Sequence, residues 1–175
     1  MWNPFASKTS TAGDRPKGII TPLQKRRYDI GAELKARAYL HDRSGFIISA
    51  VAGIAEAGDV TVLPHDCTDQ ALGEAIWAHL LQYEIKTPDI ANRKATDWAA
   101  FKASGERSVR KFQASCYLMR IETLNQAVLL NARPHESLKP TLSMAAMANH
   151  DRPAIGKAVR ECFAGARVLR DQGVI

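Results

Sequence analysis

Two stretches of the sequence share one pattern: DQALGEAIWAHL at residues 69–80 and RPAIGKAVRECF at residues 152–163. Each stretch predicts an amphipathic helix that begins after a capping residue, Thr68 or Asp151. When the two stretches are aligned without a gap, Gly73 coincides with Gly156. A glycine inside a helix costs about 1 kcal/mol relative to alanine, so a glycine at both positions indicates that another backbone comes close there. We predict equivalent contacts of each helix with the sheet that it covers.

Alternating apolar and polar residues precede each helix and predict strands. Residues 29–40 alternate throughout, which is typical of a long strand with one buried face. Shorter strands are predicted at 46–52, 60–64, 112–122, 127–133 and 140–145, with residues 53–59 as a loop. The order strand, strand, strand, helix therefore occurs twice, at about 29–84 and 106–168. We expect an α+β fold, mainly antiparallel sheet, with two pseudo-repeated units.

The domain organisation follows from composition. Residues 1–24 lack periodicity and are expected to form a flexible leader, while residues 25–175 are expected to form a single α+β domain. A short helix is predicted within residues 96–104, ending at Gly105. No apolar run is long enough to cross a bilayer, and the first residues lack the apolar core of a signal peptide. These features favour a cytoplasmic protein with no membrane association.

Residues with catalytic or metal-binding chemistry form no recognisable motif. P-loop, Rossmann glycine, nucleophile-elbow and HExxH patterns are absent from the sequence. The three cysteines are odd in number and lack CxxC spacing. His65 with Cys67 is a weak metal signal, because no second pair of ligands accompanies it. We expect no enzyme activity, no catalytic residue, no cofactor and no metal.

Binding is the function class that remains. Lys and Arg exceed Asp and Glu by 24 to 18, which is compatible with nucleic acid or an acidic partner. The candidate partner-binding residues are Lys35, Arg37 and Tyr39, on the polar face of the first predicted strand. Cations beside an aromatic ring are common at protein interfaces and also suit single-stranded nucleic acid. Trp77, at the edge of its helix, is a candidate anchor. The alternatives are a solvated sheet face for the first three and core packing over Gly73 for Trp77.

The order of these features resembles the CdiI immunity proteins of contact-dependent growth inhibition systems, in a group whose members carry two helices of this kind. The resemblance covers roughly residues 30–168 and rests on structural rather than catalytic motifs. It is carried by TDQALGEAIWAHL, Trp98, SVRKFQASCYLMRIE, a strand ending near Pro134, and HDRPAIGKAVRECF. Residues 1–24 have no counterpart in it, and the strands before the first helix match only in pattern.

The resemblance implies a Whirly-like fold and a cytoplasmic bacterial protein that is not an enzyme. It implies binding to the C-terminal toxin domain of a cognate CdiA effector, so that the producing cell is protected. A nuclease is the expected kind of toxin, and direct nucleic-acid binding is not expected. Because the chain has a formal charge of +6, either the toxin presents an acidic surface or the contact is local. The alternative is a single-stranded nucleic-acid-binding module that uses a basic and aromatic sheet face.

Overall fold

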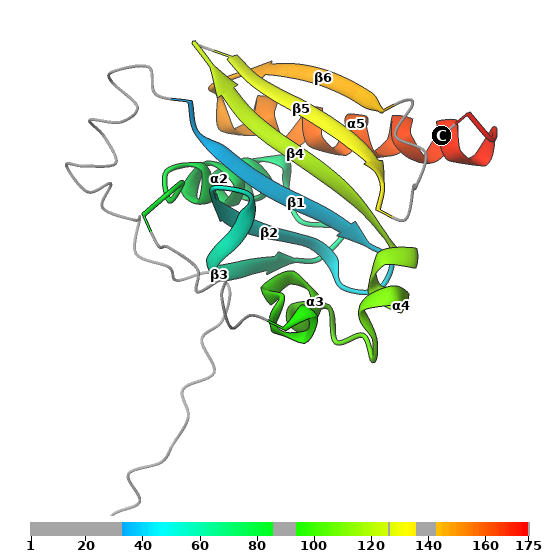
Figure 1. Ribbon diagram of the computed structural model, residues 1–175. Helices are drawn as coiled ribbons and strands as arrows, with labels where there is room; N and C mark the ends of the chain where they lie inside the picture. The colour runs from blue at the N-terminus through cyan, green and yellow to red at the C-terminus, as the bar shows by residue number, and fades with distance from the viewer. Residues whose placement is uncertain (1–32, 86–93, 126, 136–142, 175) are drawn as a thin grey trace, which may run out of the picture.

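The computed structural model describes residues 33–85, 94–125, 127–135 and 143–174, except for the side chain of Ala95. The expected leader, residues 1–24, lies outside the described residues. Six antiparallel strands form one open sheet in the order β3-β2-β1-β4-β5-β6 (Figure 1). Their bounds are β1 Lys35–His41, β2 Gly45–Ala52, β3 Ala55–Leu63, β4 Cys116–Leu124, β5 Ala127–Pro134 and β6 Met144–Asn149. The expected α+β class with a mainly antiparallel sheet is confirmed.

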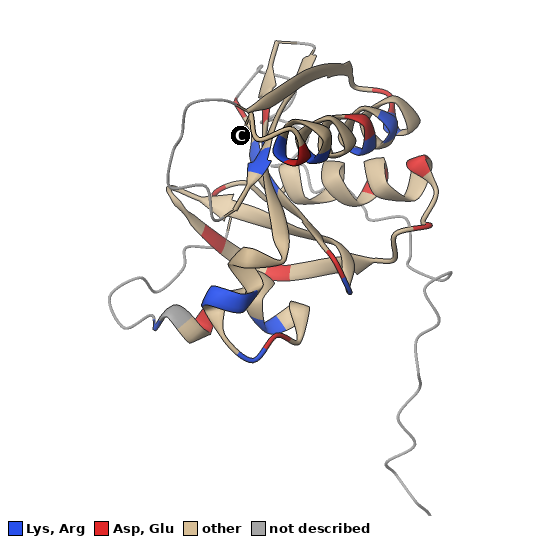
Figure 2. Ribbon diagram, turned by 90° about the vertical axis from the view of Figure 1, so that its right-hand side faces the viewer, with Lys and Arg blue, Asp and Glu red and all other residues tan. Residues whose placement is uncertain are grey.

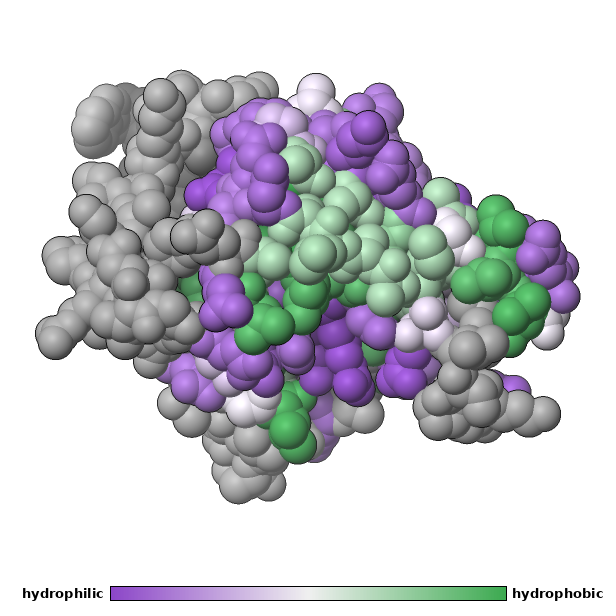
Figure 3. Space-filling model, turned by 90° about the horizontal axis from the view of Figure 1, so that it is seen from above, coloured by the Kyte–Doolittle hydropathy of each residue, from purple (hydrophilic) through white to green (hydrophobic). Residues whose placement is uncertain are grey.

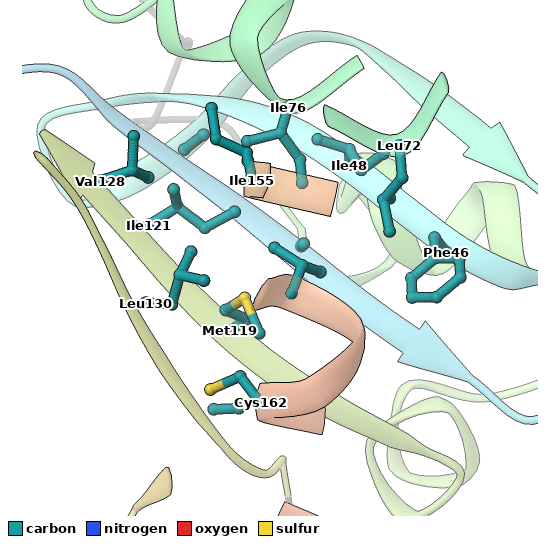
Figure 4. Close-up of a cluster of buried hydrophobic side chains, with 14 of the residues drawn as sticks. Phe46, Ile48, Leu72, Ile76, Met119, Ile121, Val128, Leu130, Ile155 and Cys162 are labelled. Atoms are coloured by element: carbon teal, nitrogen blue, oxygen red, sulfur yellow. The ribbon is translucent and has the colours of Figure 1, made fainter. Parts of the chain in front are cut away.

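Two long helices lie side by side on one face of the sheet, α2 (Asp69–Leu80) and α5 (Arg152–Asp171) (Figure 2). Thr68 and Asp151 cap them as predicted, because each side chain accepts a hydrogen bond from a backbone N–H of the first turn. Their apolar sides and the facing side chains of the sheet form the main core. Figure 4 shows its labelled members, which include Leu72, Ile76, Ile155, Ile48, Met119 and Ile121.

Gly73 and Gly156 mark a helix-on-helix contact, so the expectation that they mark helix-on-sheet contacts is wrong. A Cβ added at Gly73 would overlap the backbone carbonyl of Arg152, the first residue of α5. A Cβ added at Gly156 would overlap the carbonyl of Asp69, the first residue of α2. The two helices therefore cross near their N-termini, and each glycine admits the start of the other helix. The predicted close approach of another backbone is confirmed, but the backbone belongs to the other helix.

Arg160 of α5 holds this crossing from the side. Its Nε donates to the Asp69 carboxylate over 2.7 Å, and its Nη1 donates to the carbonyl of His65 over 2.7 Å. Its Nη2 donates to the carbonyl of Cys67. One guanidinium thus ties α5 to the segment that leads into α2, which fixes both helices on the same sheet face.

The strand predicted at 140–145 is displaced, because β6 spans Met144–Asn149, while residues 140–142 lie outside the described residues. Two other predicted local structures are wrong. Residues 53–59 are not a loop: after a turn at Gly53, strand β3 begins at Ala55, and a bulge interrupts its register with β2. That bulge breaks the two-residue period from which the strand would have been recognised. The predicted strand at 112–122 begins only at Cys116, because Val109–Ala114 forms helix α4, which Ser108 caps. A short alternating pattern cannot be distinguished from one helical turn.

A second layer covers part of the opposite sheet face, which we call the second face. It comprises the 3-10 turn η1 (Ala95–Asp97), helix α3 (Ala99–Ser104) and α4. The helix predicted within 96–104 is confirmed, with Gly105 at its end in the left-handed conformation. These elements lie over β2, β3 and the start of β4 (Figure 1). None of the helices in the described ranges is long and apolar enough to cross a membrane.

Candidate partner-binding surface

The side chains of β1 alternate between the two sheet faces as predicted. Ala36, Ala38 and Leu40 lie in the main core, and Lys35, Arg37 and Tyr39 point to the second face. The sequence placed these last three on one exposed polar face. The structure gives each of them a different environment, because α3 and α4 cover the sheet only at the Tyr39 end of the row.

Tyr39 is fully buried, with an exposed fraction of 0%, so the expectation that it lies on an exposed face is wrong. Its ring packs 5.5 Å from Phe112, 5.8 Å from Trp98 and 5.8 Å from His135, measured between ring centroids. Its hydroxyl donates to the buried carboxylate of Glu56. Burial and the nearby carboxylate raise the pKa of Tyr39 well above its ordinary value. Tyr39 is the centre of a second, smaller core on the second face.

Arg37 stands at the boundary between the covered and open parts of the second face. Its Nη2 donates to the carbonyl of Ile54 over 2.7 Å, and its Nη1 lies 3.9 Å from the Glu56 carboxylate. The Glu56 side chain is only 1% exposed. A buried carboxylate requires a compensating charge, so Arg37 has a structural role whether or not it also contacts a partner.

Lys35 lies at the open end of β1 and is half-buried. Its Nζ is 3.7 Å from Glu122 on β4 and 3.7 Å from Glu33. The two carboxylates, Glu122 first, raise the pKa of Lys35. The charge of Lys35 is therefore compensated by neighbouring carboxylates.

Trp77 is on the other side of the sheet and does not join the β1 residues. It is 6% exposed and belongs to the main core. The Arg152 guanidinium lies 3.9 Å above its ring, and the His150 ring is 5.2 Å away. This favours the core-packing interpretation, because the indole presents almost no surface to a partner.

Two arginines that we did not single out from the sequence lie beside Arg37 on the second face. The register places Arg120 of β4 directly opposite Arg37, and Asn131 of β5 directly opposite Arg120. Arg133 lies two residues further along β5 on the same face. We call Arg37, Arg120 and Arg133 the basic row. It crosses the three strands at the middle of the sheet.

The basic row carries unbalanced positive charge. Arg120 is exposed and Arg133 half-buried, and within the described ranges neither has a carboxylate at ion-pair distance. Like charges directly opposite on neighbouring strands destabilise a sheet. Arg37 and Arg120 nevertheless face each other at its centre. Exposed Leu124 and half-buried Leu129 lie further along the same face. Glu122, which lies 3.7 Å from the Nζ of Lys35, separates these leucines from Arg120, so the face carries arginine and apolar side chains, both of which are common at protein interfaces.

A separate cluster lies where β1 ends. His41 is buried, and its Nε2 is 3.5 Å from Glu106 Oε1, while Arg43 and Lys111 also approach this carboxylate, at 4.0 and 3.8 Å. The His41 Nδ1 accepts from the Ser44 N–H over 3.1 Å. Burial lowers the pKa of His41 from its ordinary value, although Glu106 opposes the shift.

This lowered pKa predicts acid sensitivity. Below the unfolded value near 6.5, the unfolded chain binds a proton at His41 that the folded chain does not take up, so the free energy of unfolding decreases as pH falls. The decrease ends once pH passes the folded pKa. We expect His41→Gln to have a shallower pH dependence than wild type in urea unfolding at pH 5 to 7. His150, whose pKa burial also lowers, keeps part of the slope in both proteins. Equal slopes would contradict the assignment.

The fold and the surface define an α+β protein with a six-stranded open antiparallel sheet, helices on both faces, and a basic row of net positive charge on the less covered face. Comparison with known sequence families and with curated proteins finds no match. Solved structures match in fold. A protein of unknown function from Neisseria meningitidis is 14% identical with a TM-score of 0.55, over 77% of this chain and 95% of that one.

A second solved structure of the same fold is a chain from the CdiA-CT/CdiI toxin and immunity complex of Yersinia pseudotuberculosis. It is 13% identical with a TM-score of 0.52, and the match covers 75% of this chain and 96% of that chain. At this identity the likeness establishes the fold alone.

Proposed function

We propose that this chain is a CdiI-type immunity protein that binds and neutralises the C-terminal toxin domain of a cognate CdiA effector, thereby protecting the producing cell. The observation that carries the proposal is the fold match to a chain of a CdiA-CT/CdiI complex, which extends over 96% of that chain. The resemblance of the two helix motifs and the connecting segment to this family is a second line of support. The protein acts by binding rather than by catalysis, and it acts in the cytoplasm.

The basic row supplies the proposed contact. Among the described residues, Arg120 and Arg133 have no carboxylate at ion-pair distance, and arginine binds carboxylates in a two-pronged geometry. A toxin surface that carries Asp or Glu would compensate the repulsion between Arg37 and Arg120, so binding would relieve an unfavourable pair. In this proposal a basic inhibitor recognises an acidic patch on the toxin. The proposal requires acidic residues only in the toxin surface that contacts the basic row, and the rest of the toxin can carry either charge.

Two finer features of the fold belong to the same proposal: an internal duplication and a Whirly-like arrangement. The sheet order β3-β2-β1-β4-β5-β6 supports duplication, because it is symmetrical about the β1–β4 pair. The reciprocal contacts of Gly73 and Gly156 support it as well. The proposed units retain the bounds of about 29–84 and 106–168.

Binding of single-stranded nucleic acid is the alternative, and the basic row is the observation that favours it. Such binders combine cations with exposed aromatic rings on which bases stack. Tyr39, the aromatic residue of β1 on the second face, is buried. The second face therefore offers cations without the stacking ring that the alternative assumed, which favours a protein partner.

The experiment is co-expression with the C-terminal domain of the protein encoded immediately upstream of this chain's gene, which under this proposal is the toxin. We expect growth to be rescued by the wild-type chain, and the purified pair to remain associated when salt is raised. Binding to single-stranded DNA or RNA should instead weaken steeply with salt. Failure to rescue together with salt-sensitive nucleic-acid binding would overturn the immunity proposal in favour of the alternative.

A further inference from the structure

The two edges of the sheet differ in how they are protected. An edge strand presents unpaired backbone groups, and proteins protect it with bulges, charged residues or proline. Edge strand β3 has a bulge in its pairing with β2, and Asp59 is exposed beside it. Edge strand β6 pairs with β5 in an unbroken register and contains no proline, glycine or charged residue. Within the residues that the structure describes, the β6 edge thus lacks the bulge and the charged residue that protect β3.

The surface around β6 is apolar. Ala145 and Met147 are exposed, and Met147 is 69% exposed. On the opposite face of the sheet, Ala146 of β6 and Ala158 of α5 are half-buried against the main core. Strand β6 lies at the top of Figure 1, and Figure 3 views the molecule from that side. Figure 3 shows a continuous pale green area of such moderately hydrophobic residues. An unprotected strand within an apolar area is a template for another strand.

We propose that two copies of this chain associate through their β6 strands, antiparallel and about a twofold axis at Ala146, to form one continuous sheet across both copies. A twofold axis requires a surface that is complementary to itself, and the sequence MAAMA at residues 144–148 meets this condition. With Ala146 opposite its own copy, Ala145 lies opposite Met147 of the second copy. Met144 then lies opposite Ala148. Each long side chain meets a methyl group on the same sheet face.

Electrostatics also favours a second copy as the occupant. Two chains of formal charge +6 repel each other at a basic surface, but β6 carries no charge. On α5, Lys157 and Glu161 are both exposed and form a balanced pair, with 3.9 Å between Nζ and Oε1. Figure 2 shows both signs of charge along α5. The basic row does not extend to β6, so it stays exposed in a β6-paired dimer. The dimer therefore neither requires nor blocks the proposed toxin contact.

Sedimentation equilibrium of the full chain from low to high micromolar concentration tests this pairing. We expect the mass to rise from that of the 19.2 kDa chain to twice that value. Met147→Lys should raise the dissociation constant at least tenfold, because it places like charges in a desolvated strand pair. Val62→Lys, at an exposed position on the opposite edge strand, is the matched control and should leave the dissociation constant unchanged.

A mixing experiment tests the register. Ala145→Glu and Met147→Lys chains should each associate weakly alone. Together they should form a mixed dimer at least tenfold more stable than either, because the carboxylate introduced at position 145 of one chain would face the ammonium group introduced at position 147 of the other. A single-chain mass for the wild type at every concentration would overturn the proposal. Dissociation by Val62→Lys but not by Met147→Lys, or absence of the mixed dimer, would overturn it as well. Circular dichroism melting of each variant separates misfolding from loss of association.

Discussion

Gly73→Ala and Gly156→Ala are each expected to lower the free energy of unfolding by about 3 kcal/mol, although alanine is the better helix former. The reason is the crossing of α2 and α5. The added methyl group would occupy the space of a backbone carbonyl of the other helix, Arg152 or Asp69, and neither can move without displacing a helix N-terminus. Urea denaturation monitored by circular dichroism measures the loss. The double variant with leucine at both positions should fail to fold.

Gly165→Ala is the matched control, since Gly165 is also inside α5. There the added methyl group would lie 3.0 Å from the side chain of Met144, which is flexible and can rotate away. We expect the free energy of unfolding of this variant to be unchanged or up to about 1 kcal/mol higher, because only the better helix propensity of alanine acts there. If Gly73→Ala and Gly156→Ala behaved like Gly165→Ala, the helix crossing would not depend on close backbone approach.

The arrangement of the two helices shows what sequence reasoning reached and where it stopped. Capping by Thr68 and Asp151 and the apolar spacing of both helices are local, so the sequence predicted them correctly. The close approach at Gly73 and Gly156 was also predicted, because an unfavourable residue at two matching places needs a cause. The sequence did not predict that the approaching backbone belongs to the other helix, because periodicity shows which side of a helix is buried and not which element buries it.

The candidate surface depended on pairing information that no single segment contains. Arg120 and Arg133 have no distinctive local sequence, and only the register of β4 with β1 and β5 brings them beside Arg37. The alternating pattern YLMRIE was the available signal, since it placed Arg120 opposite to the buried side of its strand. Tyr39 was misplaced because its cover comes from α3 and α4, which are distant from it in the sequence. Alternation shows that two faces differ, but not which elements cover each face.

Reversing the charge of the basic row should have the largest effect on binding. Under the proposed function, Arg120→Glu is expected to weaken binding of the cognate toxin domain at least about a hundredfold, and the double change with Arg133→Glu more. The substitution replaces an attraction to acidic residues of the toxin with repulsion. Arg120 is exposed and has no ion pair in the part of the chain that the structure describes, so the melting temperature should stay close to wild type. Titration calorimetry measures the affinity.

Arg170→Glu separates this local effect from a change in net charge. Arg170 is exposed in the last turn of α5, on the opposite side of the sheet, and the substitution changes the formal charge of the chain equally. Toxin affinity and growth protection should therefore remain near wild type in Arg170→Glu. If both variants weakened binding equally, recognition would follow overall charge rather than the basic row. If neither did, the toxin would bind elsewhere. Loss confined to Arg120→Glu would place an acidic partner on the second face. Only there do the described strands hold two arginines directly opposite each other, and of these Arg37 has a nearby carboxylate, Glu56, whereas Arg120 has none at ion-pair distance.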